Sequence, residues 1–195
     1  MIDQQTLTKL REFTGAGIVD CKKALDEAGG DFNGAVELLR KKGQKVAANK
    51  QERETKEGRV HAYIHGNGKA GALVEVLCET DFVARNEQFI QFCHGVAMHV
   101  VASNPLYIKP EDISDEIIAK EREIYEEQMA GENKPAEIKE KILQGKLAKY
   151  YAETCLLKQQ FIIDDSQTVE QYLTGMIAKI GEKIEIRRFS RFALS

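Results

Sequence analysis

Apolar residues in the first part of the chain recur with a helical period, and glycines interrupt this pattern twice. Leu7, Leu10 and Phe13 are spaced as a single apolar stripe, which predicts a first helix. The stretches Thr14–Gly17 and Gly29–Gly30 predict breaks, because glycine adopts turn conformations that other residues resist. The pattern therefore predicts a small bundle of three short helices.

The second helix is expected at about 19–28, with Leu25 facing inward. Asp31 is a favourable N-cap for the third helix, because its carboxylate can accept a hydrogen bond from the first turn. Gly43 predicts the end of that helix, since glycine is common just after a helical C-terminus. The apolar face of the third helix consists of Phe32, Ala35, Val36 and Leu39.

A change of composition divides the chain after this bundle. From about residue 50 to 57 almost every residue is charged or polar, which predicts a solvated linker. We therefore expect a first domain at 1–52 and a second domain at 58–195.

The second domain opens with a hairpin pattern. Apolar and polar residues alternate from Arg59 to Ile64, Gly66–Gly68 is a turn signal, and Ala72–Glu79 reads as the returning strand. A helix from about Arg85 to Ala102 follows. Its apolar positions, three and four residues apart, are Phe89, Phe92, Val96 and Val100.

Two charged helices are expected next. One begins after Ser114 and runs to about Met129, and the other runs from Pro135 to about Cys155. The turn at Gly131–Lys134 between them is short, so the two helices are expected to form an antiparallel hairpin.

The last part of the chain predicts one helix and one strand. Thr168–Gln171 has the form of a capping box, and Gly181 is suited to end the helix that it opens. Lys183–Phe192 alternates as a strand, which we expect to close the sheet beside the first hairpin. The predicted fold class is α+β: a helical bundle, then a small antiparallel sheet packed with helices and a helical hairpin.

Composition narrows the function classes. The chain has 195 residues, 43% of them hydrophobic, and a formal net charge of -3, as in ordinary globular proteins. No sign of charge dominates, so nothing points to nucleic acid or to an anionic membrane surface. The first residues lack the apolar stretch of a secretory signal, and no apolar run is long enough for a bilayer. We therefore expect a cytoplasmic protein.

The metal-ligating and nucleophilic residues form no recognisable site. The four cysteines are widely scattered and make no C-x-x-C pair, so we expect neither a metal nor a cofactor. Buried, reduced thiols are the simpler interpretation. The chain also has no nucleotide-binding loop and no nucleophile elbow, and we expect no enzyme active site. The cysteines are Cys21, Cys78, Cys93 and Cys155.

Two segments have patterns that allow both a structural and a functional role. The segment Glu79–Asn86 joins a predicted strand to a predicted helix, where functional loops are often found. Thr80 or Asp81 could instead cap the helix, and Phe82 could lie in the core. Ile18 and Val19 could likewise be core residues or an exposed apolar contact.

Five stretches that are spread over nearly the whole chain share one resemblance: Leu10–Leu25, Gly30–Phe32, Leu39–Gly43, Glu79–Asn86 and Arg187–Arg191. In this order they resemble the elongation factor Ts family, whose members promote nucleotide exchange on elongation factor Tu.

The resemblance implies roles for particular residues. The N-terminal bundle is expected to have a ubiquitin-associated-like fold and to dock on the nucleotide domain of the GTPase. The segment from Thr80 to Val83 matches the one that disturbs the partner's magnesium site. Within it, Asp81 and Phe82 are expected to act directly on the partner, with Phe82 inserted as a wedge between partner side chains. His65 and Gly66 resemble a hairpin contact. The matching contact positions in the bundle are Arg11, Ile18, Val19 and Lys22.

The chain is similar to the family's short form, because only one hairpin-and-helix unit precedes Pro105. This similarity implies a homodimer that binds elongation factor Tu and promotes the release of its GDP. We expect no cofactor, no direct contact with nucleic acid and no membrane partner. Two alternatives remain from the residues alone. One is a protein-binding adaptor that uses the bundle, and the other is a cysteine-based redox enzyme.

Overall fold

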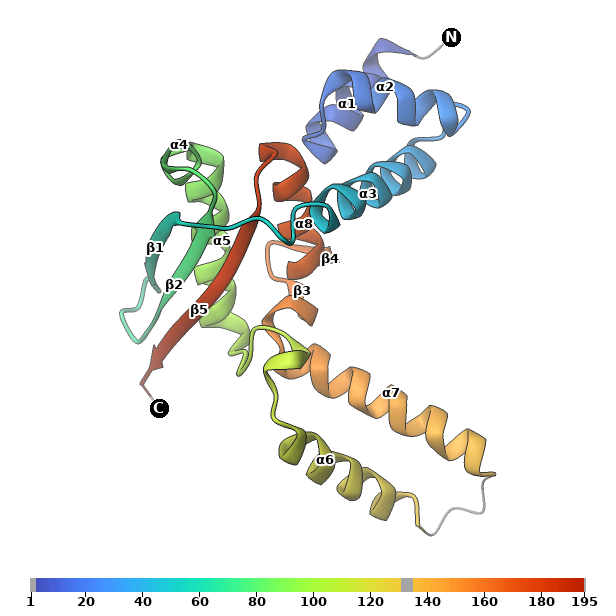
Figure 1. The fold of residues 1–195 in the computed structure, drawn as a ribbon, viewed down its shortest axis with the longest axis vertical. Helices are drawn as coiled ribbons and strands as arrows, with labels where there is room; N and C mark the ends of the chain where they lie inside the picture. The colour runs from blue at the N-terminus through green and yellow to red at the C-terminus, as the bar shows by residue number, and fades with distance from the viewer. Residues whose placement is uncertain (1–2, 131–134, 195) are drawn as a thin grey trace.

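The chain folds into a three-helix bundle, a sheet covered by helices and a protruding helical hairpin (Figure 1). The structure is a computed structural model and describes residues 3–130 and 135–194. It confirms the predicted α+β fold. The elements are α1 (Gln4–Thr14), α2 (Ile18–Glu27), α3 (Phe32–Ala48), β1 (Glu57–Ile64), β2 (Ala70–Cys78), α4 (Asp81–Ala84), α5 (Glu87–Ser103), η1 (Pro110–Asp112), α6 (Asp115–Gln128), α7 (Ala136–Thr154), η2 (Leu156–Lys158), β3 (Gln160–Phe161), β4 (Asp164–Thr168), α8 (Val169–Ile180) and β5 (Ile184–Ala193).

The N-terminal bundle has its own apolar core, formed by Leu10, Leu25 and Ala35, each 0% exposed. The predicted cap is present: the carboxylate of Asp31 accepts a hydrogen bond of 2.7 Å from the backbone N–H of Gly34. Gly15 ends α1 in the left-handed conformation with φ 66°, which glycine adopts without the steric penalty of a Cβ. The three predicted helices are confirmed.

Two details of the bundle prediction were wrong. The side chain of Phe13 is 62% exposed, so it does not continue the apolar stripe into the core. Helix α3 also runs past Gly43 to Ala48, and Gly43 is buried. A Cβ at Gly43 would lie 3.5 Å from the Cβ of Ala178 on α8, an ordinary van der Waals contact, so α3 continues here packed against α8. Packing between helices outweighs the local tendency of glycine to end one.

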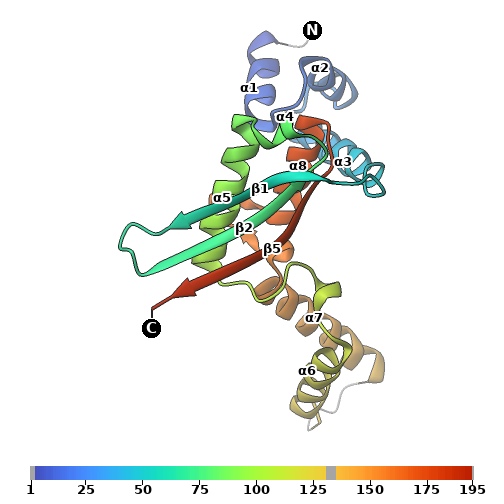
Figure 2. The same cartoon turned by 60° about the vertical axis from the view of Figure 1, so that its left-hand side comes forward.

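Three antiparallel strands form the main sheet, in the order β1–β2–β5 (Figure 2). The last strand pairs with β2 and so closes the sheet beside the first hairpin, as predicted. A β-bulge shifts the register of β5: Glu75 pairs with Arg188, whereas the next residue, Val76, pairs with Ile186. The predicted strand position is therefore confirmed.

Helices cover one face of this sheet and leave the other face open (Figure 2). Val74 and Val76 of β2 are buried with Phe89 and Phe92 of α5 in the main core. In β1 the side chain of His61 faces α5, where its Nε2 lies 3.2 Å from Nδ1 of His94. The apolar residues of the alternating pattern therefore lie on the open face. The exposed large apolar residues of the strands are Val60, Ile64, Leu73 and Phe192.

The helical hairpin of α6 and α7 projects from the end of the molecule opposite the bundle (Figures 1 and 2). Met129, Leu143 and Leu147 form a small core between these helices. The predicted antiparallel arrangement is present, whereas the predicted turn at Gly131–Lys134 lies outside the described residues. Within residues 3–130 and 135–194, no helix is long and apolar enough to cross a bilayer.

A second, two-stranded sheet follows the helical hairpin in the chain and packs against α8. Strands β3 and β4 pair antiparallel just before α8. The ring of Phe161 stacks on Tyr172 of α8, with centroids 4.4 Å apart. The Thr168 hydroxyl accepts from the backbone N–H of Gln171, and the Gln171 side chain accepts from the Thr168 N–H, so the predicted capping box is confirmed.

Candidate protein interface

An exposed aromatic side chain marks the junction between β2 and α5. Phe82 lies in the four-residue helix α4, and its side chain is 85% exposed. This observation decides one of the open points about the segment: Phe82 is a surface residue and does not belong to the core. An aromatic side chain has a large apolar area to bury, so the exposed ring of Phe82 is a candidate for contact with another molecule.

The residues on either side of Phe82 anchor the loop that carries it. Val83 and Ala84, which follow directly, are 9% and 8% exposed and belong to the main core. Thr80 is the N-cap, because its hydroxyl accepts from the backbone N–H of Val83 at 3.4 Å. The carboxylate of Asp81 pairs with Arg85 at 3.0 Å, one turn further along. The loop is therefore anchored on its inner side and presents Phe82 outward.

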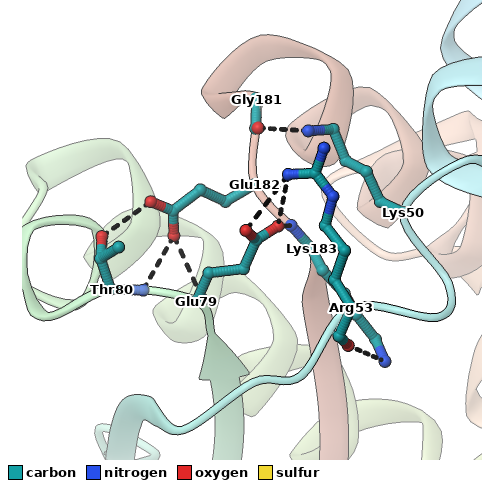
Figure 3. A network of polar contacts seen from close by, with 7 residues as sticks. All are labelled: Lys50, Arg53, Glu79, Thr80, Gly181, Glu182 and Lys183. Atoms are coloured by element: carbon teal, nitrogen blue, oxygen red, sulfur yellow. Dashed lines mark hydrogen bonds and ion pairs between the residues drawn. The ribbon is translucent and has the colours of Figure 1, made fainter.

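A glutamate from the other end of the chain holds the start of this loop (Figure 3). The carboxylate of Glu182 accepts hydrogen bonds from the backbone N–H of Glu79 at 3.1 Å and from that of Thr80 at 3.0 Å. It also accepts from the Thr80 hydroxyl at 2.7 Å. Gly181 ends α8 with φ 82°, and this left-handed turn leads the chain directly into Glu182.

The linker before β1 is fastened to the same corner (Figure 3). The Glu79 carboxylate accepts from the Lys183 backbone N–H at 2.6 Å and pairs with Arg53 at 3.2 Å. These two contacts, led by the Lys183 N–H, hold the pKa of Glu79 below its usual range. The Lys183 ammonium donates to the carbonyl oxygens of Gln51 and Arg53, both at 2.9 Å. Most residues of this segment are exposed, but its hydrogen bonds hold it at the corner, so it is not a free tether.

The predicted contact positions in the bundle form an exposed surface. Ile18 and Val19 are 54% and 63% exposed, so they are surface residues rather than core residues. Lys22 lies one turn after Ile18 on the same helix and is exposed, as is Arg11 on α1. The bundle and α4 lie at the same end of the molecule (Figures 1 and 2).

His65 and Gly66 lie elsewhere, in the turn that follows β1. Both are exposed, and the His65 ring nitrogen Nδ1 lies 3.1 Å from the Tyr63 hydroxyl. Strand β1 has eight residues, which corresponds to about 25 Å between this turn and the end of the sheet that leads into α4. The fold therefore does not bring His65 to Phe82, and a partner would meet them as separate contacts.

Cys78 and Cys93 do not have the character of reactive thiols. All four cysteines are free and buried. Burial raises the pKa of Cys78 to about 11 and that of Cys93 to about 12, whereas a reactive thiol needs a lowered pKa. Within the described parts of the chain, no group of three or more histidine, cysteine or acidic side chains could hold a metal ion.

Comparison with known proteins identifies the family. The family model described as "Elongation factor TS" matches residues 22–175. An elongation factor Ts of Carboxydothermus hydrogenoformans is 52% identical over 100% of this chain and 89% of its own length. One from Caldanaerobacter subterraneus is 51% identical, over 98% of this chain and 96% of its own, and one from Thermotoga petrophila is 50% identical, over 99% and 96%.

The chain belongs to the elongation factor Ts family. Its alignment with these relatives covers nearly their full length. A translation elongation factor Ts role follows from this membership.

Sequence reasoning missed three residues that shape the Phe82 loop in this elongation factor Ts family member. Glu182, Lys183 and Arg53 make the polar contacts described above, but each looks like an ordinary surface charge in the sequence. The only local signal was Gly181, which places a turn before Glu182. Their role is seen only in the folded structure, where segments far apart in the sequence lie in contact.

Proposed function

We propose that this protein accelerates the release of GDP from elongation factor Tu. The observation that carries the proposal is the exposure of Phe82 on a loop whose following residues are buried. A rigid aromatic that protrudes from a fixed base can insert between side chains of a partner at little cost in its own ordering. The family membership supports elongation factor Tu as that partner.

The proposed mechanism is a coupling between two binding equilibria. A factor that binds the nucleotide-free GTPase more tightly than the loaded form must, by thermodynamic reciprocity, weaken the hold on the nucleotide. Insertion of Phe82, with Asp81 beside it, would shift a packed element near the bound magnesium ion. Packed helices respond to such contacts in discrete steps, and loss of the ion removes the charge that holds the diphosphate. The nucleotide and magnesium sites belong to elongation factor Tu, and the protein acts without an active site of its own.

Other surfaces would supply binding energy without acting on the magnesium site. Arg11, Ile18, Val19 and Lys22 would dock on the nucleotide domain, because they expose apolar and basic groups together. His65 and Gly66 would touch a separate part of the partner. Thr80 and Val83 would hold Phe82 in place, since one caps α4 and the other anchors it in the core.

We propose further that the open face of the sheet joins two copies of the protein. On this face Ile64 and Phe192 flank Gly71, and Leu73 lies in the adjacent pair. Exposed apolar side chains gathered on one sheet face are suited to packing against an identical face about a two-fold axis. A dimer would present two Phe82 loops and two bundles to the partner.

Release of a fluorescent GDP analogue from elongation factor Tu, measured with and without the protein, tests the proposal. A large increase in the release rate at catalytic amounts of the protein is expected. Tight binding to elongation factor Tu with no effect on release would favour the adaptor alternative. No binding at all would refute both.

A further inference from the structure

We propose that Glu182 is a positioning residue for Phe82: its carboxylate holds the backbone from which the wedge projects. This inference rests on the proposed function and extends it to a residue far away in the sequence. Glu182 itself would not touch the partner. It would act by fixing the direction in which α4 leaves the sheet.

The Glu182 carboxylate accepts three hydrogen bonds from the residues immediately before α4 (Figure 3). Its Oε2 accepts from the N–H groups of two consecutive residues, Glu79 and Thr80, at 3.1 and 3.0 Å. Its Oε1 accepts from the Thr80 hydroxyl at 2.7 Å. Three donors on two neighbouring residues define an orientation as well as a position, and hydrogen bonds to a charged acceptor are stronger than neutral ones. Phe82 follows two residues later.

Helix α4 depends on this support because it is too short to hold itself. It has four residues, and such short helices are not stable without outside contacts. Val83 and Ala84 anchor it on the core side only. The Thr80 hydroxyl donates to Glu182 and accepts from the Val83 N–H, so the carboxylate also orients the cap of α4.

The contact between the two segments is reciprocal, because each contributes a carboxylate to the other's backbone. Glu182 binds backbone N–H groups before α4, while the Glu79 side chain binds the backbone N–H of Lys183, the residue after Glu182. Each segment thus fixes the other through a carboxylate and a main-chain donor. Thr80 is exposed, so the loss of these surface hydrogen bonds should disturb the loop more than it lowers the stability of the whole fold.

The test compares Glu182→Ala and Glu182→Gln with the control Glu185→Ala. Glu185 also lies on the segment after α8 and is exposed, but its nearest cation is Lys183 at 3.7 Å and it does not contact Thr80. The control therefore removes the same charge and leaves the hydrogen bonds between Glu182 and the residues before α4 in place. Glu182→Gln keeps the shape and one acceptor oxygen, so an intermediate effect is expected, and it serves as the folded alternative if the alanine variant is unstable.

The first measurement is hydrogen exchange of the Glu79 and Thr80 amides in the full-length protein without a partner. Both amides should exchange faster in Glu182→Ala and stay protected in Glu185→Ala. Amides that remain protected in Glu182→Ala and in Glu182→Gln would overturn the positioning role, whatever the protein does to elongation factor Tu.

The second measurement is release of a fluorescent GDP analogue over a range of factor concentrations. Glu182→Ala should lower the maximal release rate on the order of tenfold, because a small misplacement of an acting group is costly. The concentration for half-maximal release should change little, since the bundle contacts remain. Maximal rates equal to the control would overturn the inference alone. A wild-type protein that fails to accelerate release would overturn the proposed function, and with it the functional part of the inference.

Discussion

Phe82 and Val83 are neighbours on α4, yet 85% of Phe82 is exposed while only 9% of Val83 is. The pair divides two tasks between adjacent positions: one side chain fastens the loop to the core and the other faces outward. Substitutions at the two positions should therefore have opposite effects: one at Phe82 should lower the acceleration of GDP release, and one at Val83 should lower the stability of the fold. The difference offers a direct way to separate partner contact from stability.

Phe82→Ala should leave the melting temperature nearly unchanged and remove most of the acceleration of GDP release. The reason is that an exposed ring contributes little to folding, whereas a buried phenylalanine replaced by alanine typically costs about 3–5 kcal/mol. Val83→Ala is the matched control and should lower the free energy of unfolding by about 2 kcal/mol, because two buried methyl groups are lost. Thermal melts and the release assay on both variants check this. A strongly destabilised Phe82→Ala, or one with full activity, contradicts the wedge.

The sequence could predict that this loop exists but not which way Phe82 points. The strand before it and the helix after it follow from periodicity, and Thr80 is a suitable N-cap. The direction of the loop depends on Glu182, which is 102 residues away from Thr80. A charged residue after a helix carries no local mark of such a contact, so only the fold reveals it.

Other differences between expectation and structure have the same origin in tertiary contacts. Alternation in β1 predicted a strand correctly, but His61 packs against α5 while Val60 is 64% exposed. Period alone cannot tell which side of a strand is covered. The small sheet of β3 and β4 was missed because Asp164–Thr168 is polar throughout and has no apolar alternation.

The double variant Ile18→Ser/Val19→Ser should weaken binding to elongation factor Tu while the bundle stays folded. Both side chains are more than half exposed, so their loss removes little from the core of the bundle. Titration calorimetry against nucleotide-free elongation factor Tu should show the weaker affinity. At saturating concentration the release rate should recover, because Phe82 is intact.

Leu25→Ala provides the contrast within the same helix. Leu25 is 0% exposed, and its truncation should cost about 2–5 kcal/mol of stability. If the Ile18/Val19 variant binds with unchanged affinity, these residues are not an interface and the docking role of the bundle is refuted.

Acid should destabilise the fold partly through His99. The imidazole is 0% exposed, with Nε2 2.9 Å from Oε1 of Gln159 and Nδ1 accepting from the Ile162 N–H at 3.2 Å. Burial lowers the pKa of His99, and the hydrogen bond to Gln159 opposes that shift only in part. A ring that accepts at Nδ1 and donates at Nε2 is neutral, so the folded protein resists its protonation.

The sign of the pH effect follows from this lowered pKa. Above about pH 6.5 the ring is neutral in both the folded and unfolded states, and His99 contributes no pH dependence. As the pH falls from there toward the folded-state pKa, the unfolded chain binds the extra proton, and stability drops by up to about 1.4 kcal/mol per pH unit. Urea denaturation between pH 7 and pH 5 should show this loss.

His99→Gln should flatten this part of the curve, although the variant will be less stable at pH 7. His61→Gln is the comparison variant, because burial also lowers the pKa of His61. His61 should account for a separate share of the loss of stability between pH 7 and pH 5. A wild-type slope that survives unchanged in His99→Gln would contradict this assignment.

A lysine on the open sheet face should dissociate the proposed dimer. Leu73 lies in the central strand, 46% exposed, opposite Ala62 on one side and Ser190 on the other. In a two-fold face-to-face packing, Leu73→Lys would place like charges in an apolar contact, which costs far more than it would on a free surface.

Ile138→Lys on α7, at 45% exposure, makes the same change on the hairpin, away from the sheet. Sedimentation equilibrium at micromolar concentration under reducing conditions should give a dimer for the wild type and for Ile138→Lys, and a monomer for Leu73→Lys. All four thiols are buried, so a disulfide is not expected to hold the dimer together. A wild-type monomer that releases nucleotide at full rate would refute the dimer, and a dimeric Leu73→Lys would show that another surface forms it.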